Sequence, residues 1–185
     1  MLTRIKEVIL QFLWLTPLIG LTFNQSIAAE LDTQSEFEKI VCEFQQKFWD
    51  APNDAAQGLL KLKRDQKFHT LFNNRNRFNQ WNAIVVDMDS TSSGKLYLSV
   101  QIGCRSKLQT WNNEFSDMLD STLINSSDAN FEKVLTLGVG DKVSVSGQFI
   151  PTANLKIGET SLTSKGSMMN PEFLVVFKTI NKTKR

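Results

Sequence analysis

The hydrophobic pattern of the chain changes near residue 78, from the period of a helix to the period of a strand. Upstream of that point, apolar side chains recur three and four residues apart, which is typical of an amphipathic helix. They are Phe37, Ile40, Val41, Phe44 and Phe48. Ser35 and Glu38 form a capping box just before this run, so we expect the helix to begin there, after a flexible lead over residues 29–34.

A second helix is predicted to follow directly. Pro52, Asn53 and Asp54 end the first helix and begin the next, because proline fits only the first turn of a helix and Asn and Asp favour its cap. The apolar residues of the second helix continue to about residues 65–67. Residues 35–67 are therefore predicted to form an N-terminal helical hairpin.

Downstream, polar and apolar residues alternate, as they do in half-buried strands. The segment LYLSVQI, residues 96–102, places Leu96, Leu98 and Val100 on one face. The segment VSVSG, residues 143–147, does the same for Val143, Val145 and Gly147. The strands predicted in this way are 78–88, 95–102, 108–111, 143–149 and 173–180, with a short helix over 128–135 and loops over 112–120 and 151–172.

This element order gives the predicted fold class, which is α+β: a helical hairpin followed by a five-stranded β-barrel with one helix between strands 3 and 4. The segments WNAIVVDM, GKLYLSVQI, NFEKVLTL, GDKVSVSGQF and FLVVFKTI resemble, in order, the elements of an OB-fold, a small Greek-key barrel. The resemblance covers residues 78–180 and extends to exported bacterial proteins with an OB-fold-like domain. Another small antiparallel barrel, such as an SH3-like one, is the alternative. The resemblance implies binding of a ligand and no particular chemistry, because OB barrels bind nucleic acids, sugars, peptides and proteins.

The first 28 residues have the order of a secretory signal peptide. Arg4 and Lys6 precede a largely apolar run over residues 8–23, and Ser26 and Ala28 supply small residues before a cleavage site. A retained membrane anchor is the alternative, although Pro17 and Gly20 interrupt the run. We expect export to the bacterial periplasm or the medium, and no transmembrane segment once residues 1–28 are removed.

Two cysteines, Cys42 and Cys104, meet an oxidising environment in an exported protein. A disulfide between them would close a loop of 62 residues and stabilise the fold by about 4 kcal/mol in the chain-entropy model. Two free, partly buried thiols are the alternative, because sequence spacing does not reveal the distance between the two Cα atoms.

Charge is close to balanced over the whole chain but uneven along it. The chain carries 21 basic and 19 acidic residues, which gives no general attraction to nucleic acid or anionic membranes. Residues 61–77 nevertheless hold one acid among six bases, and a basic patch or a solvated helix face can both account for this. The six bases are Lys61, Lys63, Arg64, Lys67, Arg75 and Arg77.

Residues that could bind a ligand are predicted on the second and third strands, the face that the OB resemblance implies. Aromatic and basic side chains there suit stacking and contacts with anions. They are Tyr97, Gln101, Arg105, Lys107 and Trp111. Trp49, Trp81 and Trp111 are each expected to be buried or half-buried.

Residues with catalytic potential are few. His69 is the single histidine and lies within no recognisable motif, so it is interpreted as a surface or packing residue. Asp87 and Asp89 could hold Mg²⁺ or Ca²⁺, but Asp also favours a hairpin turn. We therefore expect no catalytic residue, metal or cofactor.

The sequence thus favours an exported, non-enzymatic binding module whose ligand is a protein, a peptide or an envelope polymer rather than nucleic acid. The alternative is a secreted metal-dependent hydrolase, such as a nuclease, on the same barrel.

The signal peptide generates the first testable prediction. Cleavage after Ala28 should leave a mature chain that begins at Ala29, with Glu30 as the next choice for the first residue. Intact-mass measurement on protein recovered from the envelope or the medium checks this. Recovery of the full 21.0 kDa chain in the inner membrane would show that the segment is a retained anchor.

Overall fold

The computed structural model describes the backbone of residues 21–72, 75–152 and 157–183, and side chains from Thr33 onward. Most of the predicted signal peptide, residues 1–20, lies outside the described residues. The predicted cleavage site at Ala28 falls within the first helix, Leu21–Trp49.

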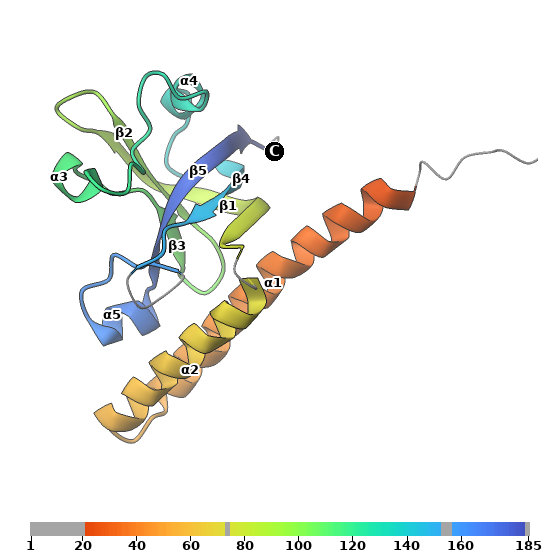
Figure 1. Ribbon diagram of the computed structural model, residues 1–185, viewed down its shortest axis with the longest axis vertical. Helices are drawn as coiled ribbons and strands as arrows, with labels where there is room; N and C mark the ends of the chain where they lie inside the picture. The colour runs from red at the N-terminus through yellow and green to blue at the C-terminus, as the bar shows by residue number, and fades with distance from the viewer. Residues whose placement is uncertain (1–20, 73–74, 153–156, 184–185) are drawn as a thin grey trace, which may run out of the picture.

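Two long antiparallel helices form the N-terminal hairpin, α1 over Leu21–Trp49 and α2 over Asp54–Phe72 (Figure 1). The predicted lead and capping box were wrong, because Ser35 lies in the interior of α1. Residues 29–34 contain neither glycine nor proline, so nothing local stops the helix before Ser35. The second helix also runs past the predicted end, to Phe72, because Phe68 and Phe72 are buried on its inner face.

Five strands close into a barrel, with the order β1-β2-β3-β5-β4. Their bounds are Arg77–Ser90 for β1, Leu96–Gln101 for β2, Lys107–Gln109 for β3, Lys142–Phe149 for β4 and Glu172–Lys182 for β5. The β3–β5 pair is parallel and the other four pairs are antiparallel. The predicted α+β class, with helices followed by a barrel, is confirmed, and this strand order is compatible with the OB-like arrangement.

Three short helices interrupt the connections between strands. The chain between β3 and β4 contains α3, Glu114–Asp117, as well as the predicted helix α4, Phe131–Leu135. The loop predicted over 112–120 therefore includes a helical turn, which Asn113 caps by accepting a hydrogen bond from Ser116 N at 2.9 Å. The loop predicted over 151–172 likewise includes α5, Ser164–Met169, capped by Thr163.

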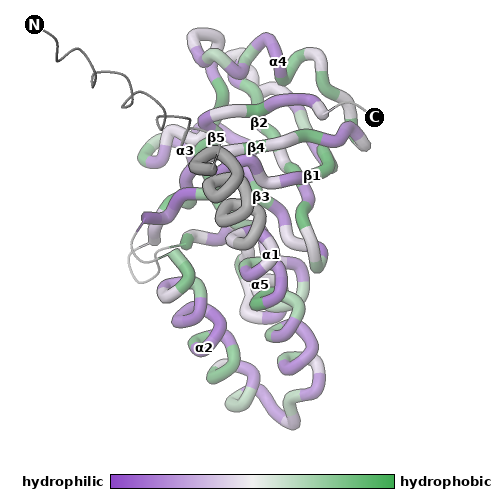
Figure 2. Tube along the Cα trace, turned by 90° about the vertical axis from the view of Figure 1, so that its right-hand side faces the viewer, coloured by the Kyte–Doolittle hydropathy of each residue, from purple (hydrophilic) through white to green (hydrophobic). Residues whose placement is uncertain are grey.

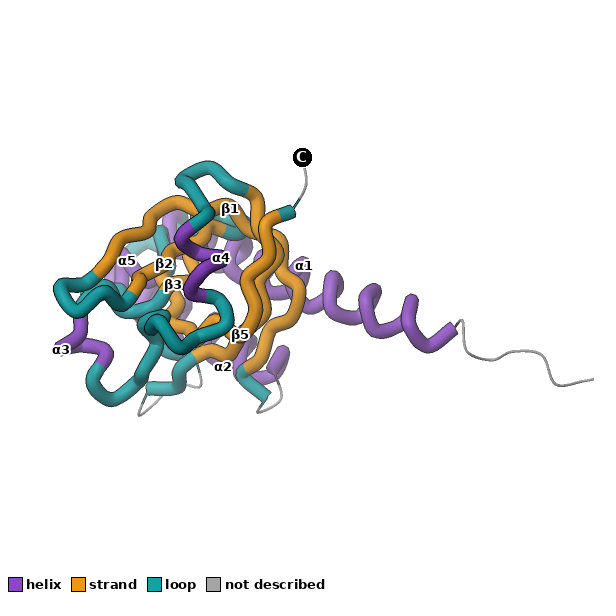
Figure 3. Tube along the Cα trace, turned by 90° about the horizontal axis from the view of Figure 1, so that it is seen from above, coloured by secondary structure: helices purple, strands orange, loops and turns teal. Residues whose placement is uncertain are grey.

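The helices cover the two ends of the barrel. Seen from above, α4 lies across the near end, while α1 extends beyond the barrel (Figure 3). Asn130 fastens α4 to β5, because its Oδ1 accepts a hydrogen bond from Ile180 N at 3.0 Å and its Nδ2 donates one to Lys178 O at 3.2 Å. The helical hairpin lies toward the opposite end (Figure 1).

A cluster of aromatic rings joins the hairpin to the barrel. Phe37 of α1 is fully buried, and its ring centroid lies 4.7 Å from that of Phe68 on α2. It also lies 5.1 Å from Trp81 on β1 and 5.0 Å from Phe173 on β5. Green and purple segments alternate along α2 in Figure 2, so only part of each helix supplies this apolar face. The hairpin and the barrel therefore share one hydrophobic core.

Trp49 lies outside that core, with a relative exposed area of 70%. Its predicted burial was wrong, because α1 ends there, past the last buried residue, Phe48. The same prediction is confirmed for Trp81, which is 1% exposed, and for Trp111, which is half-buried.

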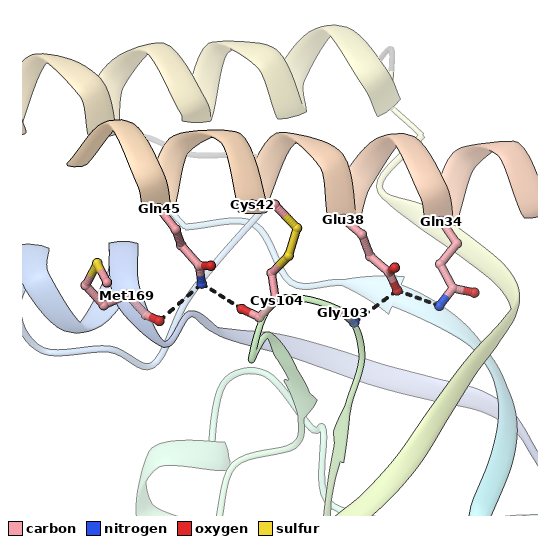
Figure 4. Close-up of a disulfide and its surroundings, with 7 residues drawn as sticks. All are labelled: Gln34, Glu38, Cys42, Gln45, Gly103, Cys104 and Met169. Atoms are coloured by element: carbon pink, nitrogen blue, oxygen red, sulfur yellow. Dashed lines mark hydrogen bonds between the residues drawn. A yellow bond between two sulfur atoms is a disulfide. The ribbon is translucent and has the colours of Figure 1, made fainter. Parts of the chain in front are cut away.

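A polar stripe along α1 fixes the helix against the barrel (Figure 4). Gln34 pairs with the backbone of Asn82 on β1, donating to its carbonyl at 2.9 Å and accepting from its N–H at 2.9 Å. Glu38, which was predicted to cap its own helix, accepts a hydrogen bond from Gly103 N at 3.0 Å instead. The next two residues of the stripe, Cys42 and Gln45, follow at helical spacing.

Cys42 and Cys104 form a disulfide, with their Cα atoms 5.4 Å apart. Gln45 Nε2 donates hydrogen bonds to Cys104 O at 2.6 Å and to Met169 O at 3.1 Å. Of the two alternatives that the sequence left open, the structure has the bonded pair, which ties α1 to the turn between β2 and β3.

A buried ion pair fastens the second helix of the hairpin. Arg64 of α2 is 1% exposed and contacts the carboxylates of Asp65 and Glu159, while its Nη1 donates a hydrogen bond to Ser167 O at 2.6 Å. Burial raises the pKa of the Glu159 carboxyl above its usual value, and the positive charge of Arg64 opposes this shift. The pair connects α2 to the segment between β4 and β5.

The alternation in β4 can be tested by substitution. Val145 is fully buried, so Val145→Ala should cost about 1–3 kcal/mol of unfolding free energy by leaving a cavity. Ser144 is half-buried on the other face, and Ser144→Ala should cost less than about 0.5 kcal/mol. Gly147→Val should cost at least as much as Val145→Ala, because a Cβ there would lie 2.8 Å from Phe78 Cζ and would collide with Val176 O. Urea melts measure all three, and equal costs for Val145 and Ser144 would contradict the alternation.

The buried ion pair generates a pH-dependent prediction. Arg64→Leu should cost about 3–5 kcal/mol near neutral pH, because it leaves a buried carboxylate uncompensated. Since the pKa of Glu159 is raised in the folded state, lowering the pH protonates it and removes that charge, so the cost should shrink at pH 5. Urea melts at both pH values check this. Lys63→Leu on the exposed face of α2 is the matched control and should change stability by less than about 0.5 kcal/mol. If Arg64→Leu lowers the unfolding free energy by the same amount at both pH values, the role given to Glu159 is contradicted.

Candidate ligand-binding cleft

The outer face of β2 and β3, predicted to bind a ligand, is occupied by contacts within the protein. The hydroxyl of Tyr97 donates a hydrogen bond to Asp87 on β1, and Lys107 forms a 3.1 Å ion pair with Glu172 on β5. Burial and the bond to Asp87 raise the pKa of Tyr97 above its usual value, so its hydroxyl stays protonated and remains a donor. Gln101 is exposed and stands opposite Lys107 in the β2–β3 pairing.

The other two predicted residues of this set lie elsewhere. Arg105 is exposed in the β2–β3 turn beside the disulfide, with a left-handed backbone of φ 57°. Trp111 follows β3, and its Nε1 donates a hydrogen bond to Asp120 at 2.8 Å. Tyr97, Gln101 and Lys107 thus lie on β2 and β3 themselves, and Arg105 and Trp111 lie in the segments that flank β3.

The predicted basic patch also divides into parts. Arg64 is buried, as described, and Lys61 forms a 2.8 Å ion pair with Asp65. Lys63 and Lys67 are exposed along α2. Arg75 and Arg77, at the junction of α2 with β1, line a cleft.

This cleft, of about 990 Å³, lies between the end of the hairpin and the barrel. The hairpin contributes Thr33, Leu71 and Phe72, and strands β4 and β5 contribute Ser146, Gly147, Gln148 and Lys178. The rest of the lining comes from the start of β1 and the residues before it: Arg75, Arg77, Phe78, Asn79 and Trp81.

A bulge in β1 shapes the floor of the cleft. The β1–β4 register shifts between Phe78 and Trp81, and Gln80 adopts a left-handed φ of 51°. The bulge directs the rings of Phe78 and Trp81 into the core and leaves Asn79 exposed at the rim. Gly147 passes so close to Phe78 that no side chain fits at this position.

Positive charge dominates the lining. Arg75, Arg77 and Lys178 are exposed, and none forms an ion pair with a described residue. The lining residues that the structure describes include no Asp or Glu. Trp81, which also lines the cleft, has a buried Nε1 with no hydrogen-bond partner among the described residues. The cleft therefore offers cations and hydrogen-bond donors, a chemistry that suits an anionic ligand.

Groups with catalytic potential lie away from this cleft. His69 is exposed on α2, Asp87 accepts the Tyr97 hydroxyl, and Asp89 Oδ1 accepts a hydrogen bond from Ser90 N at 2.7 Å. Within the described residues there is no group of three or more His, Cys, Asp and Glu side chains that could hold a metal ion. The hairpin-turn interpretation of Asp89 agrees with its bond to Ser90.

Sequence reasoning missed Asn79, Gln148 and Lys178. The signal for Lys178 was the interruption of the apolar run FLVVF by a lysine, which indicated an outward position on the last strand. No local signal could have placed that lysine beside Arg77, because the two lie about 100 residues apart.

A comparison of the chain with known proteins finds no match among family models, curated proteins or solved structures. Across residues 21–72, 75–152 and 157–183, no helix has the length and apolar composition required to cross a membrane.

Proposed function

We propose that the protein is an exported, non-enzymatic binding module that holds an anionic ligand in the cleft between its helical hairpin and its barrel. The observation that carries this proposal is that Arg75, Arg77 and Lys178 line one cleft whose described residues include no carboxylate. Like charges without a counter-charge among the described residues repel one another, so a ligand that neutralises them gains free energy on binding.

The cleft is built on rigid parts of the structure, which supports the same proposal. The rings beneath the cleft belong to the shared core, and the disulfide and polar stripe of α1 hold the hairpin against the barrel. A preformed site loses little entropy when a ligand binds. The disulfide also suits the oxidising compartment that the predicted signal peptide implies.

Photo-crosslinking in the envelope of the native host tests this proposal. A benzophenone amino acid at Gln148, on the rim of the cleft, should capture a protein, peptide or envelope polymer. The same probe at Gln101 tests the β2–β3 face, and Ser126 in an exposed loop is the control. Capture from Gln101 but not from Gln148 would place the site on the β2–β3 face and contradict the proposal.

The hydrolase alternative has its own measurement. The mature chain, residues 29–185, should leave DNA and RNA intact in the presence of Ca²⁺ or Mg²⁺. Cleavage that is lost in Asp87→Asn would show that the carboxylates beside Tyr97 serve catalysis.

A further inference from the structure

The cations of the cleft come from different segments of the chain: Arg77 lies on β1, and Lys178 lies on β5. Arg77 stands opposite Gln148 on β4, and Gln148 stands opposite Val176 on β5, two residues before Lys178. Two strand spacings separate β1 from β5, which is about 10 Å. Together with Arg75, these residues bring three positive charges to one lining, more than a single carboxylate or phosphate neutralises, so the arrangement suits a ligand with repeated anionic groups.

The aromatic side chains of the lining are not available for stacking. Phe72 is 5% exposed, Phe78 is 3% exposed and Trp81 is 1% exposed, so no ring face among them is open to a nucleobase. Proteins that bind single-stranded nucleic acid combine basic grooves with open aromatic faces. The cleft has the first feature without the second.

The backbone of the cleft is also unavailable for hydrogen bonds to a peptide ligand. Strand β4, at its centre, is paired with β1 on one side and β5 on the other. A peptide that binds by strand addition needs a free edge, which β4 lacks. Recognition must therefore use side chains.

The polar side chains of the cleft can form hydrogen bonds with hydroxyl groups of a ligand. Asn79 Oδ1 accepts a hydrogen bond from Ser146 Oγ at 2.7 Å, which leaves its Nδ2 free to donate, and Gln148 offers a second amide. Amides of this kind both donate to and accept from sugar hydroxyls, while the arginines and the lysine bind carboxylates.

We propose that the ligand is an acidic glycan, a polysaccharide that carries repeated carboxylates among its hydroxyls and lies across β1, β4 and β5. This inference rests on the proposed function, since it names the class of ligand for the same cleft. Binding should weaken as salt screens the exposed charges.

Titrations of the oxidised mature chain with defined probes test the ligand class. The probes are an oligogalacturonate, a neutral glucan oligosaccharide, and poly-L-glutamate and oligothymidylate of the same charge number as the oligogalacturonate. We expect the oligogalacturonate to bind most tightly, with NMR shifts at the side-chain amides of Asn79 and Gln148. The neutral glucan should bind at least tenfold more weakly.

Matched variants locate the binding. The double variant Arg77→Ala/Lys178→Ala should reduce oligogalacturonate affinity about tenfold, because two charge contacts are lost. The control Lys63→Ala/Lys67→Ala removes the same charge from the exposed face of α2 and should change affinity less than about twofold. All four positions are exposed, and an unchanged amide spectrum away from the substitutions confirms that each variant is folded.

The outcomes separate this inference from the proposed function. Equal binding of poly-L-glutamate, oligothymidylate and oligogalacturonate at the cleft would overturn the glycan inference and leave an anion-binding module. Capture from Gln148 without binding of any probe would also overturn the glycan inference alone. If no probe shifts the cleft resonances and Gln148 captures nothing, both proposals fail.

Discussion

The packing of Phe37 is the contact on which the rest of the structure depends. Its ring lies between α2, β1, β4 and β5, with Phe68, Trp81, Phe149 and Phe173 as neighbours. A two-helix hairpin cannot bury an apolar stripe by itself, and a five-stranded barrel leaves an open apolar end. Each supplies the surface that the other lacks, so the hairpin and the barrel share one core.

Polar contacts fix the direction in which the hairpin crosses that core. Gln34, Glu38, Cys42 and Gln45 all face the barrel from one side of α1, and three of them hydrogen-bond to its backbone groups. Apolar packing alone is not directional, whereas these bonds and the disulfide set the register of the helix along the strands. Because α2 returns along α1 and leads into β1, this register also sets the position of the cleft.

The distribution of charge pairs explains why binding is proposed on the β1–β4–β5 side. On the β2–β3 face, Tyr97 and Lys107 already have acidic partners in Asp87 and Glu172, and Arg64 is held in the interior by Glu159. Arg75, Arg77 and Lys178 have no such partners among the described residues. A cation without an internal counter-charge is the one that gains most from an anionic ligand.

The sequence by itself determined the two long helices, the helix α4 and the five strands, because periods of 3.6 and 2 record the face of each element that is buried. It did not reveal the short helices α3 and α5. The sequence also indicated that Arg64 would be buried, because Arg64 lies on the same face of the helix as Phe68 and Phe72. Tertiary structure alone decided that Cys42 reaches Cys104 and that Lys178 joins Arg75 and Arg77. Each of these contacts connects residues more than 60 positions apart, and barrel closure and hairpin docking, which no local pattern encodes, bring them together.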